Sequence, residues 1–238
     1  MNSKTIDLIS QLLAIFSSIT LLVPPVLWYL KKKARNSYTF TLTLSFFLYF
    51  LSALFQNSII RTDGESTSMI AGIGMLLQPL LTMLFLHHFV QNKEFKTDLM
   101  AGLICLLIAH LILFMVFGIK PAVMLVAFGM GFALVVSFGI MIIRSVIREL
   151  LQPKKGLSKF ILIIGVILLH ASFLFSWLAT LRFFQIGEQI SQLIFSTTVI
   201  LFCSIITVGI LMDSRQVVMR NTRKKYAGLL LLGESHTP

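Results

Sequence analysis

The sequence has few charged residues. Only 12% of its 238 residues are Asp, Glu, Lys or Arg, whereas soluble domains contain roughly 25%. Hydrophobic residues make up 57%, so a soluble domain of this length could not cover its surface with polar groups. The two cysteines, Cys105 and Cys203, form no CxxC pair, which excludes a disulfide scaffold. The composition also excludes a disordered chain and indicates a membrane protein.

The apolar segments lack the residues on which chemistry inside a membrane usually depends. None of the nine acidic residues, and no Lys or Arg, lies in the middle of an apolar run. This absence excludes a retinal Schiff base, which needs a lysine in the last segment, and it argues against carboxylate-driven ion coupling. No GxSG, HExxH, Walker or dinucleotide glycine motif is present. We therefore expect a protein that is not an enzyme and has no cofactor.

Long apolar runs are what the sequence does have. Seven runs have 20 or more residues, and each can cross a hydrocarbon layer of ~30 Å at ~1.5 Å per residue. Strands of a barrel would alternate apolar and polar residues, and these runs do not. The predicted fold class is an all-α integral membrane protein, a seven-transmembrane helix bundle over residues 1–212 with a basic tail over 213–238. The predicted helices cover residues 8–30, 38–60, 69–90, 99–118, 121–143, 159–181 and 190–212.

The basic residues predict the orientation of this bundle. Sixteen of the 20 Lys and Arg residues fall in the first, third and fifth loops and in the tail, and four fall on the opposite side. Cytoplasmic loops carry such an excess, so we expect the N-terminus outside and the C-terminus in the cytoplasm, in a bacterial inner (plasma) membrane. Topology and anionic lipid already explain the net charge of +11, so it does not indicate nucleic acid binding.

Two histidines are expected near the middle of the membrane. His110 and His170 each lie about 11 residues past the predicted cytoplasmic start of a helix, so they share one depth. One interpretation is a pair of haem or metal ligands, because neutral imidazole serves both. The interpretation we favour is two neutral histidines, each hydrogen-bonded to a Ser, a Thr or a backbone carbonyl. No Cys, Asp or second His pair completes a metal site.

Neutral polar residues form helical stripes that point to a binding site. Residues 41, 45, 49, 52 and 56 are spaced by three or four, and so are several polar residues after 189. Polar groups in hydrocarbon must face protein or water, so these stripes are predicted to face into the bundle. We expect a pocket in the outer half for a small neutral or amphiphilic ligand, although ordinary interhelical hydrogen bonding would also explain the stripes. The candidate ligand-binding residues are Tyr49, Gln56, Gln78, Trp177 and Gln192.

One stretch resembles a known family. Residues 77–90, Leu-Gln-Pro-Leu-Leu-Thr-Met-Leu-Phe-Leu-His-His-Phe-Val, are similar to the third helix in the N-terminal seven-helix sensor region of bacterial histidine kinases. In both, a proline in an apolar helix precedes an aromatic-rich cytoplasmic exit. The basic first loop is also similar, and the likeness covers roughly residues 1–95. It implies a sensory module that signals through a partner, because this chain carries no kinase after the seventh helix.

The expected function is therefore a non-enzymatic membrane sensor or receptor, or an accessory subunit of a signalling complex. Ligand binding would shift the third, sixth and seventh predicted helices, and a cytoplasmic or membrane partner would read the shift through loops 31–37 and 144–158 and the tail 213–238. One alternative is a small-solute permease, which the missing charged residues and the missing repeat disfavour. Another is a haem-binding redox subunit built on His110 and His170.

Overall fold

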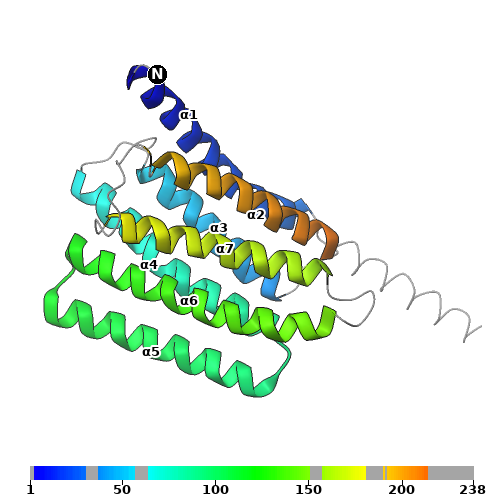
Figure 1. The fold of residues 1–238 in the computed structure, drawn as a ribbon. Helices are drawn as coiled ribbons and strands as arrows, with labels where there is room; N and C mark the ends of the chain where they lie inside the picture. The colour runs from blue at the N-terminus through cyan, green and yellow to red at the C-terminus, as the bar shows by residue number, and fades with distance from the viewer. Residues whose placement is uncertain are drawn as a thin grey trace, which may run out of the picture.

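The computed structural model is a bundle of roughly parallel and antiparallel helices (Figure 1). It describes residues 3–30, 37–56, 64–150, 157–180, 190 and 192–213, and these ranges contain no strand, which confirms the all-α prediction. The last described helix is Gln192–Asp213. The helices before it are α1 (Ser3–Leu21), α2 (Val23–Leu30), α3 (Ser37–Gln56), α4 (Gly64–Phe89), α5 (Lys93–Phe117), α6 (Pro121–Leu150) and α7 (Leu157–Thr180).

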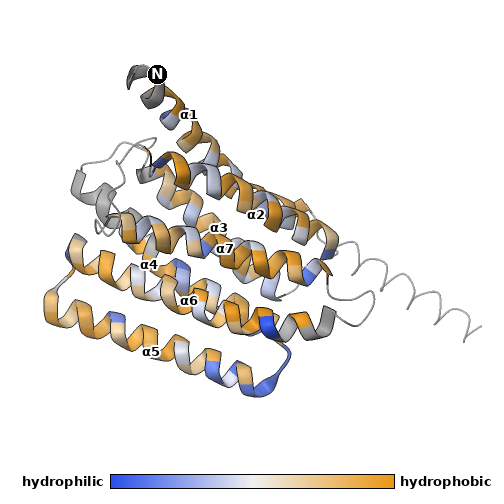
Figure 2. Cartoon of the chain, viewed as in Figure 1, coloured by the Kyte–Doolittle hydropathy of each residue, from blue (hydrophilic) through white to orange (hydrophobic). Residues whose placement is uncertain are grey.

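The helices have the length and composition of a membrane bundle. Within the described residues, six segments are long and apolar enough to span a bilayer, and a seventh, Tyr38–Leu54, is apolar but shorter. Figure 2 shows hydrophobic residues along most of the length of the helices, with hydrophilic ones near the right-hand ends of α5 and α6. The architecture is that of a multi-pass membrane protein. The six long segments are Leu8–Leu30, Gly72–Phe89, Lys93–Phe117, Ala122–Arg144, Leu157–Ala179 and Gln192–Asp213.

Helix α4 holds the bundle together. It packs against α3, α5 and α6, and its contact with α3 is the most extensive among the helices α1–α7. Helix α7 packs against α6 and, on another side, against the last described helix. A Cβ atom on Gly209 would lie 2.9 Å from the Cα atom of Leu162, so the backbones of these two helices approach each other directly, as small residues allow in membrane bundles.

The first predicted span is divided into two helices. The sequence predicts one helix over residues 8–30, but α1 ends at Leu21 and α2 begins at Val23. Pro24 and Pro25 explain the break, because proline has no N–H to donate to the carbonyl four residues earlier. Both prolines fall in the first turn of α2, where a helix needs no such donor.

Other boundaries differ from the predicted ones for local reasons. Helix α5 begins at Lys93, six residues before the predicted start, because the Asn92 side chain caps it by accepting a 3.0 Å bond from the Glu94 N–H. It ends at Phe117, and the next residue, Gly118, has a φ of 75°, which is readily adopted only by glycine. We call the two ends of the bundle the Asp213 end, where α4 finishes and α5 begins, and the Ala179 end, where α5 finishes and α6 begins (Figure 1).

Candidate functional site

A chain of hydrogen bonds joins three helices in the middle of the bundle. The Ser45 Oγ atom on α3 lies 3.2 Å from Thr82 Oγ1 on α4. Thr82 Oγ1 lies 3.0 Å from His170 Nε2 on α7. The other ring nitrogen, His170 Nδ1, lies 2.7 Å from the Val166 carbonyl oxygen one turn earlier on α7. All three side chains are almost completely buried. The hydrogen bonds between them connect α3, α4 and α7.

The chemistry of the groups fixes the direction of these bonds. A carbonyl oxygen only accepts, so the Nδ1–H group of His170 donates to Val166. The ring is deeply buried and no acidic group contacts it among the described residues, so the neutral form is the one that fits. Its Nε2 atom then accepts from the Thr82 hydroxyl, and the Thr82 oxygen accepts from Ser45. Each of the three donors, on Ser45, Thr82 and His170, therefore has one acceptor.

Two buried side chains next to this chain have polar atoms without partners. Gln78 has no exposed surface, and neither its Oε1 nor its Nε2 atom has a hydrogen-bond partner. The hydroxyl of Tyr49, which is 5% exposed, also has none. An unpaired buried amide or hydroxyl costs about 1–3 kcal/mol, so this region of the bundle has unused capacity to bind a polar group.

Tyr49 and Gln78 lie in one layer of the antiparallel α3–α4 pair. Tyr49 is one turn after Ser45, and Gln78 is one turn before Thr82, so both lie one turn closer to the Ala179 end. One turn further, Ser52 packs against Gly74, where a Cβ atom would lie 2.1 Å from the Ser52 Oγ atom. The Tyr49–Gln78 layer is therefore bounded by the Ser45–Thr82 hydrogen bond on one side and by the contact of the Ser52 side chain with Gly74 on the other.

Aromatic rings form the wall of this layer on α6 and α7. The ring of Tyr49 stacks on Phe173 with 4.4 Å between centroids and 9° between planes. Phe173 in turn stacks on Phe132, at 5.4 Å and 21°. Pro79 packs against α6 at Gly131, where a Cβ atom would lie 2.7 Å from the proline ring. The Tyr49 ring is therefore held against rigid aromatic surfaces, and the residue after Gln78 is held against α6.

Of the other three candidate residues, Trp177 and Gln192 do not join Tyr49 and Gln78. Trp177 is partly buried on α7, but its Nε1–H group already donates to the Leu125 carbonyl at 2.7 Å, so it offers no free hydrogen bond to a ligand. Gln192 is exposed, and the prediction that it faces into the bundle is wrong. It lies at the start of the described segment Gln192–Asp213, near the Ala179 end of the bundle. The side chain of Gln56 lies outside the described residues.

The two histidines are bonded to protein groups. Both ring nitrogens of His170 are engaged by Thr82 and Val166, so neither is left to bind iron. His110 donates from Nε2 to the Ala127 carbonyl at 2.9 Å. These bonds confirm that each of the two histidines is hydrogen-bonded to a Thr or to a backbone carbonyl. In the part of the chain that the structure describes, no three His, Cys, Asp or Glu side chains come together as metal ligands.

Sequence reasoning found the stripe on α3 but missed what it contacts. Thr41, Ser45, Tyr49 and Ser52 are all buried, as predicted. The hydrogen bonds from Ser45 through Thr82 to His170 were not predicted, and neither was the aromatic wall of Phe132 and Phe173. The sequence does contain a signal for these contacts. Residues 45 and 49 on one apolar run and residues 78 and 82 on the next are each four apart, and in an antiparallel pair of helices 45 lies level with 82 and 49 with 78.

Comparisons with protein-family models, with curated proteins and with solved structures found no match to this chain.

Proposed function

We propose that this protein is a non-enzymatic membrane receptor, or an accessory subunit of a signalling complex, that binds a small neutral or amphiphilic ligand at Tyr49 and Gln78. The observation that carries the proposal is the Gln78 amide, fully buried with neither polar atom paired. A ligand hydroxyl or carbonyl would satisfy this amide and the Tyr49 hydroxyl together. A neutral ligand fits because no charged side chain contacts the layer among the described residues.

The layer is well placed to change helix positions. Gln78 precedes Pro79, which removes one N–H from the helix ladder of α4. The next turn carries Thr82, the link to His170 on α7. A ligand that bonds Gln78 in one arrangement of α4 and α7 and not in another would shift the population between the two. The partner surfaces, loops 31–37 and 144–158 and the tail 213–238, fall largely outside the described residues.

The orientation that we propose has the Ala179 end outside the cell. The side chains of Lys93, Lys96, Arg144 and Lys159 lie toward the Asp213 end, and Lys120 lies at the Ala179 end. An excess of basic residues favours the cytoplasmic face, which here is the bacterial cytoplasm. A cytoplasm-active reporter fused after residue 226 should work, and one inserted within residues 61–68 should report the exterior. The opposite result at both sites would overturn the orientation.

Binding can be tested with 1-octanol, a neutral amphiphile with one hydroxyl group. We expect it to raise the melting temperature of the purified full chain, and we expect Gln78→Leu and Tyr49→Phe to abolish that shift. The matched control is Gln192→Leu, an amide-to-leucine change at an exposed position, which should keep the shift. An octanol shift that survives in Gln78→Leu would refute binding at this layer.

Receptor behaviour requires that binding move the Asp213 end. Spin labels at two exposed positions there, His88→Cys on α4 and Leu157→Cys on α7, would report the distance between the two helices. The exposed Cys105 is first replaced by Ser. Octanol should change this distance in the otherwise wild-type chain and not in Gln78→Leu. An unchanged distance together with uptake of octanol-sized solutes into vesicles would refute the receptor and favour a permease.

A further inference from the structure

An acidic side chain is buried at the Asp213 end of the bundle. Asp213 is 7% exposed, whereas Glu94 and Asp98, the other acidic side chains whose exposure the structure describes, are exposed. The hydroxyl group of Tyr38, near the start of α3, donates a hydrogen bond to Asp213 Oδ2. A carboxylate can only accept hydrogen bonds, and burying one without a donor costs free energy. The bond from Tyr38 therefore favours the buried position of Asp213.

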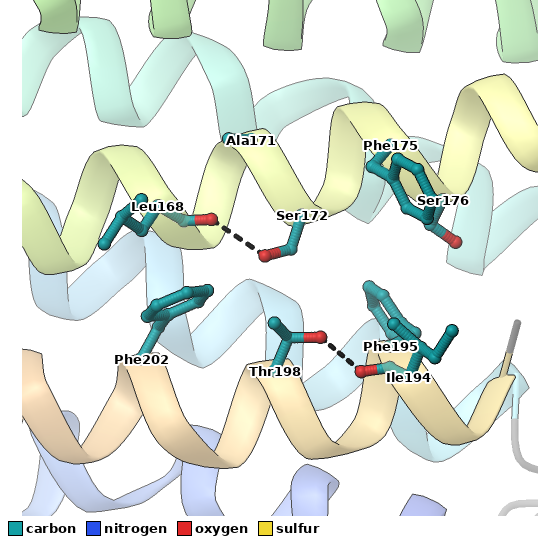
Figure 3. A pocket seen from close by; sticks show the side chains of 9 residues that line it. All are labelled: Leu168, Ala171, Ser172, Phe175, Ser176, Ile194, Phe195, Thr198 and Phe202. Atoms are coloured by element: carbon teal, nitrogen blue, oxygen red, sulfur yellow. Dashed lines mark hydrogen bonds between the residues drawn. The ribbon is translucent and has the colours of Figure 1, made fainter.

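This bond differs from those made by the hydroxyl groups along the last described helix. At the pocket between α7 and this helix, Ser172 and Thr198 each donate to a carbonyl four residues earlier in their own helix (Figure 3). Ser204 does the same. A bond inside one helix does not hold two helices together, whereas the Tyr38–Asp213 bond joins residues that are 175 positions apart. It connects the end of the last described helix to α3.

The ring of Tyr38 connects the same bond to α4. It lies edge-on to Phe89, with 5.8 Å between centroids and 90° between planes, and its centroid is 6.5 Å from that of Phe85. Residues 78, 82, 85 and 89 are spaced by four, three and four, so Gln78 and Thr82 share one face of α4 with these two rings. All four are buried. A shift of α4 would therefore move the surface against which Tyr38 packs.

We propose that the Tyr38–Asp213 bond is a latch that couples the Gln78 site to the C-terminal tail. While the bond is made, Asp213 stays buried and the end of its helix stays bonded to α3. A shift of α4 that draws Tyr38 away leaves Asp213 without its donor, so the carboxylate moves toward water. The tail follows directly at residue 214 and moves with it. The coupling rests on the proposed function, whereas the latch itself does not.

The latch can be tested without a ligand in the full chain that carries Cys105→Ser. Spin labels at two exposed positions, His88→Cys on α4 and Val208→Cys on the last described helix, report the distance between these helices. We expect Tyr38→Phe to lengthen this distance by about 2 Å, the size of a typical helix shift, because Asp213 then lacks its donor. An unchanged distance in folded Tyr38→Phe would overturn the latch.

A double variant separates the latch from a general loss of packing. When Tyr38→Phe is combined with Asp213→Leu, no carboxylate needs a donor, and an apolar pair can occupy the same place. The distance should then return to the wild-type value. A distance that stays long in the double variant would mean that lost packing displaces the helix, and would refute the latch. Tyr29→Phe, at a position that is 64% exposed, is the matched control and should leave the distance unchanged.

Octanol and the same two labels test the coupling. Octanol should change the His88–Val208 distance when Tyr38 is present and not in Tyr38→Phe, which should still show the octanol-induced rise in melting temperature. A distance response that persists in Tyr38→Phe would refute the coupling, and so would a melting shift with no distance response in the labelled wild type. If octanol does not shift the melting temperature at all, the proposed function fails and the coupling fails with it. The latch is then still decided by the variants without ligand, so the two failures are distinguishable.

Discussion

Helix α5 and the core formed by α3, α4 and α7 differ in which side chains they expose and which they bury. Only a narrow strip of α5 is buried, and its outer face consists of residues such as Ile108 and Leu111, more than half exposed. The core buries Ser45, Thr82 and His170 and pairs them with one another. In hydrocarbon an apolar residue loses little by staying outside, whereas a polar one must find a partner inside. Polar side chains, more than apolar ones, therefore mark the centre of this protein.

The largest expected effect comes from the two histidines. His170→Ala removes the final acceptor for Thr82 and leaves a hole between aromatic rings, so it should lower the free energy of unfolding by about 3 kcal/mol. His110→Ala on α5 breaks one bond to the Ala127 carbonyl and should cost about 1 kcal/mol. Melting in detergent checks the order. A larger loss for His110→Ala would contradict the contrast between core and α5.

Substitutions at two glycines test whether the core is packed more rigidly than α5. A methyl group at Gly209 would meet the backbone of Leu162 at 2.9 Å, whereas at Gly102 on α5 it would meet the ring of Phe138 at 2.7 Å. Backbone cannot move aside, but the half-buried Phe138 ring can turn. Gly209→Ala should therefore cost about 2 kcal/mol and Gly102→Ala less than 1 kcal/mol. Equal losses in a melting assay would show that the edge of the bundle is as rigid as its centre.

Gln78→Leu should raise stability in the absence of ligand. It removes a buried amide without partners and replaces it with a side chain of similar size, for an expected gain of about 1 kcal/mol. Gln192→Leu, at an exposed position, should change the melting temperature little. A loss of stability in Gln78→Leu would show that the amide is already satisfied in the folded protein.

The smallest effect is expected on the outer face of α5. Leu111 is 59% exposed, and its truncation to Ala exchanges one apolar surface for another. Leu111→Ala should stay within about 0.5 kcal/mol of the wild type in the same melting assay. A loss above 1 kcal/mol would mean that another protein surface, such as a second copy, covers this face in the detergent-purified state.

The sequence was sufficient for the features that depend on one helix at a time. Long apolar runs predicted the helices, and the spacing of Thr41, Ser45 and Tyr49 predicted which face of α3 is buried. It was insufficient where two helices meet. Only the three-dimensional register brings Thr82 to His170, and only the position of α6 gives the Trp177 indole its carbonyl partner, Leu125.

The wrong prediction for Gln192 has an identifiable cause. Gln192 continues the helical spacing of Ser196 and Cys203, and both of these residues are buried. A stripe of polar residues predicts burial only where a neighbouring helix covers it, and the sequence does not show where that helix ends.

The break at Leu22 could be predicted in part from the sequence, since two adjacent prolines remove two hydrogen-bond donors from one turn.

The split between α1 and α2 also has a mechanical consequence. Pro24 and Pro25 leave the carbonyls of Thr20 and Leu21 without the amide donors that a continuous helix would supply. The first span therefore has a hinge between α1 and α2. Bending at this point breaks fewer backbone hydrogen bonds than bending a continuous helix would. Both α1 and α2 pack against α3, so a change of angle at this hinge would shift the α1–α3 contact while the α2–α3 contact keeps its place. The first span can in this way adjust its tilt to the thickness of the surrounding bilayer without repacking α2.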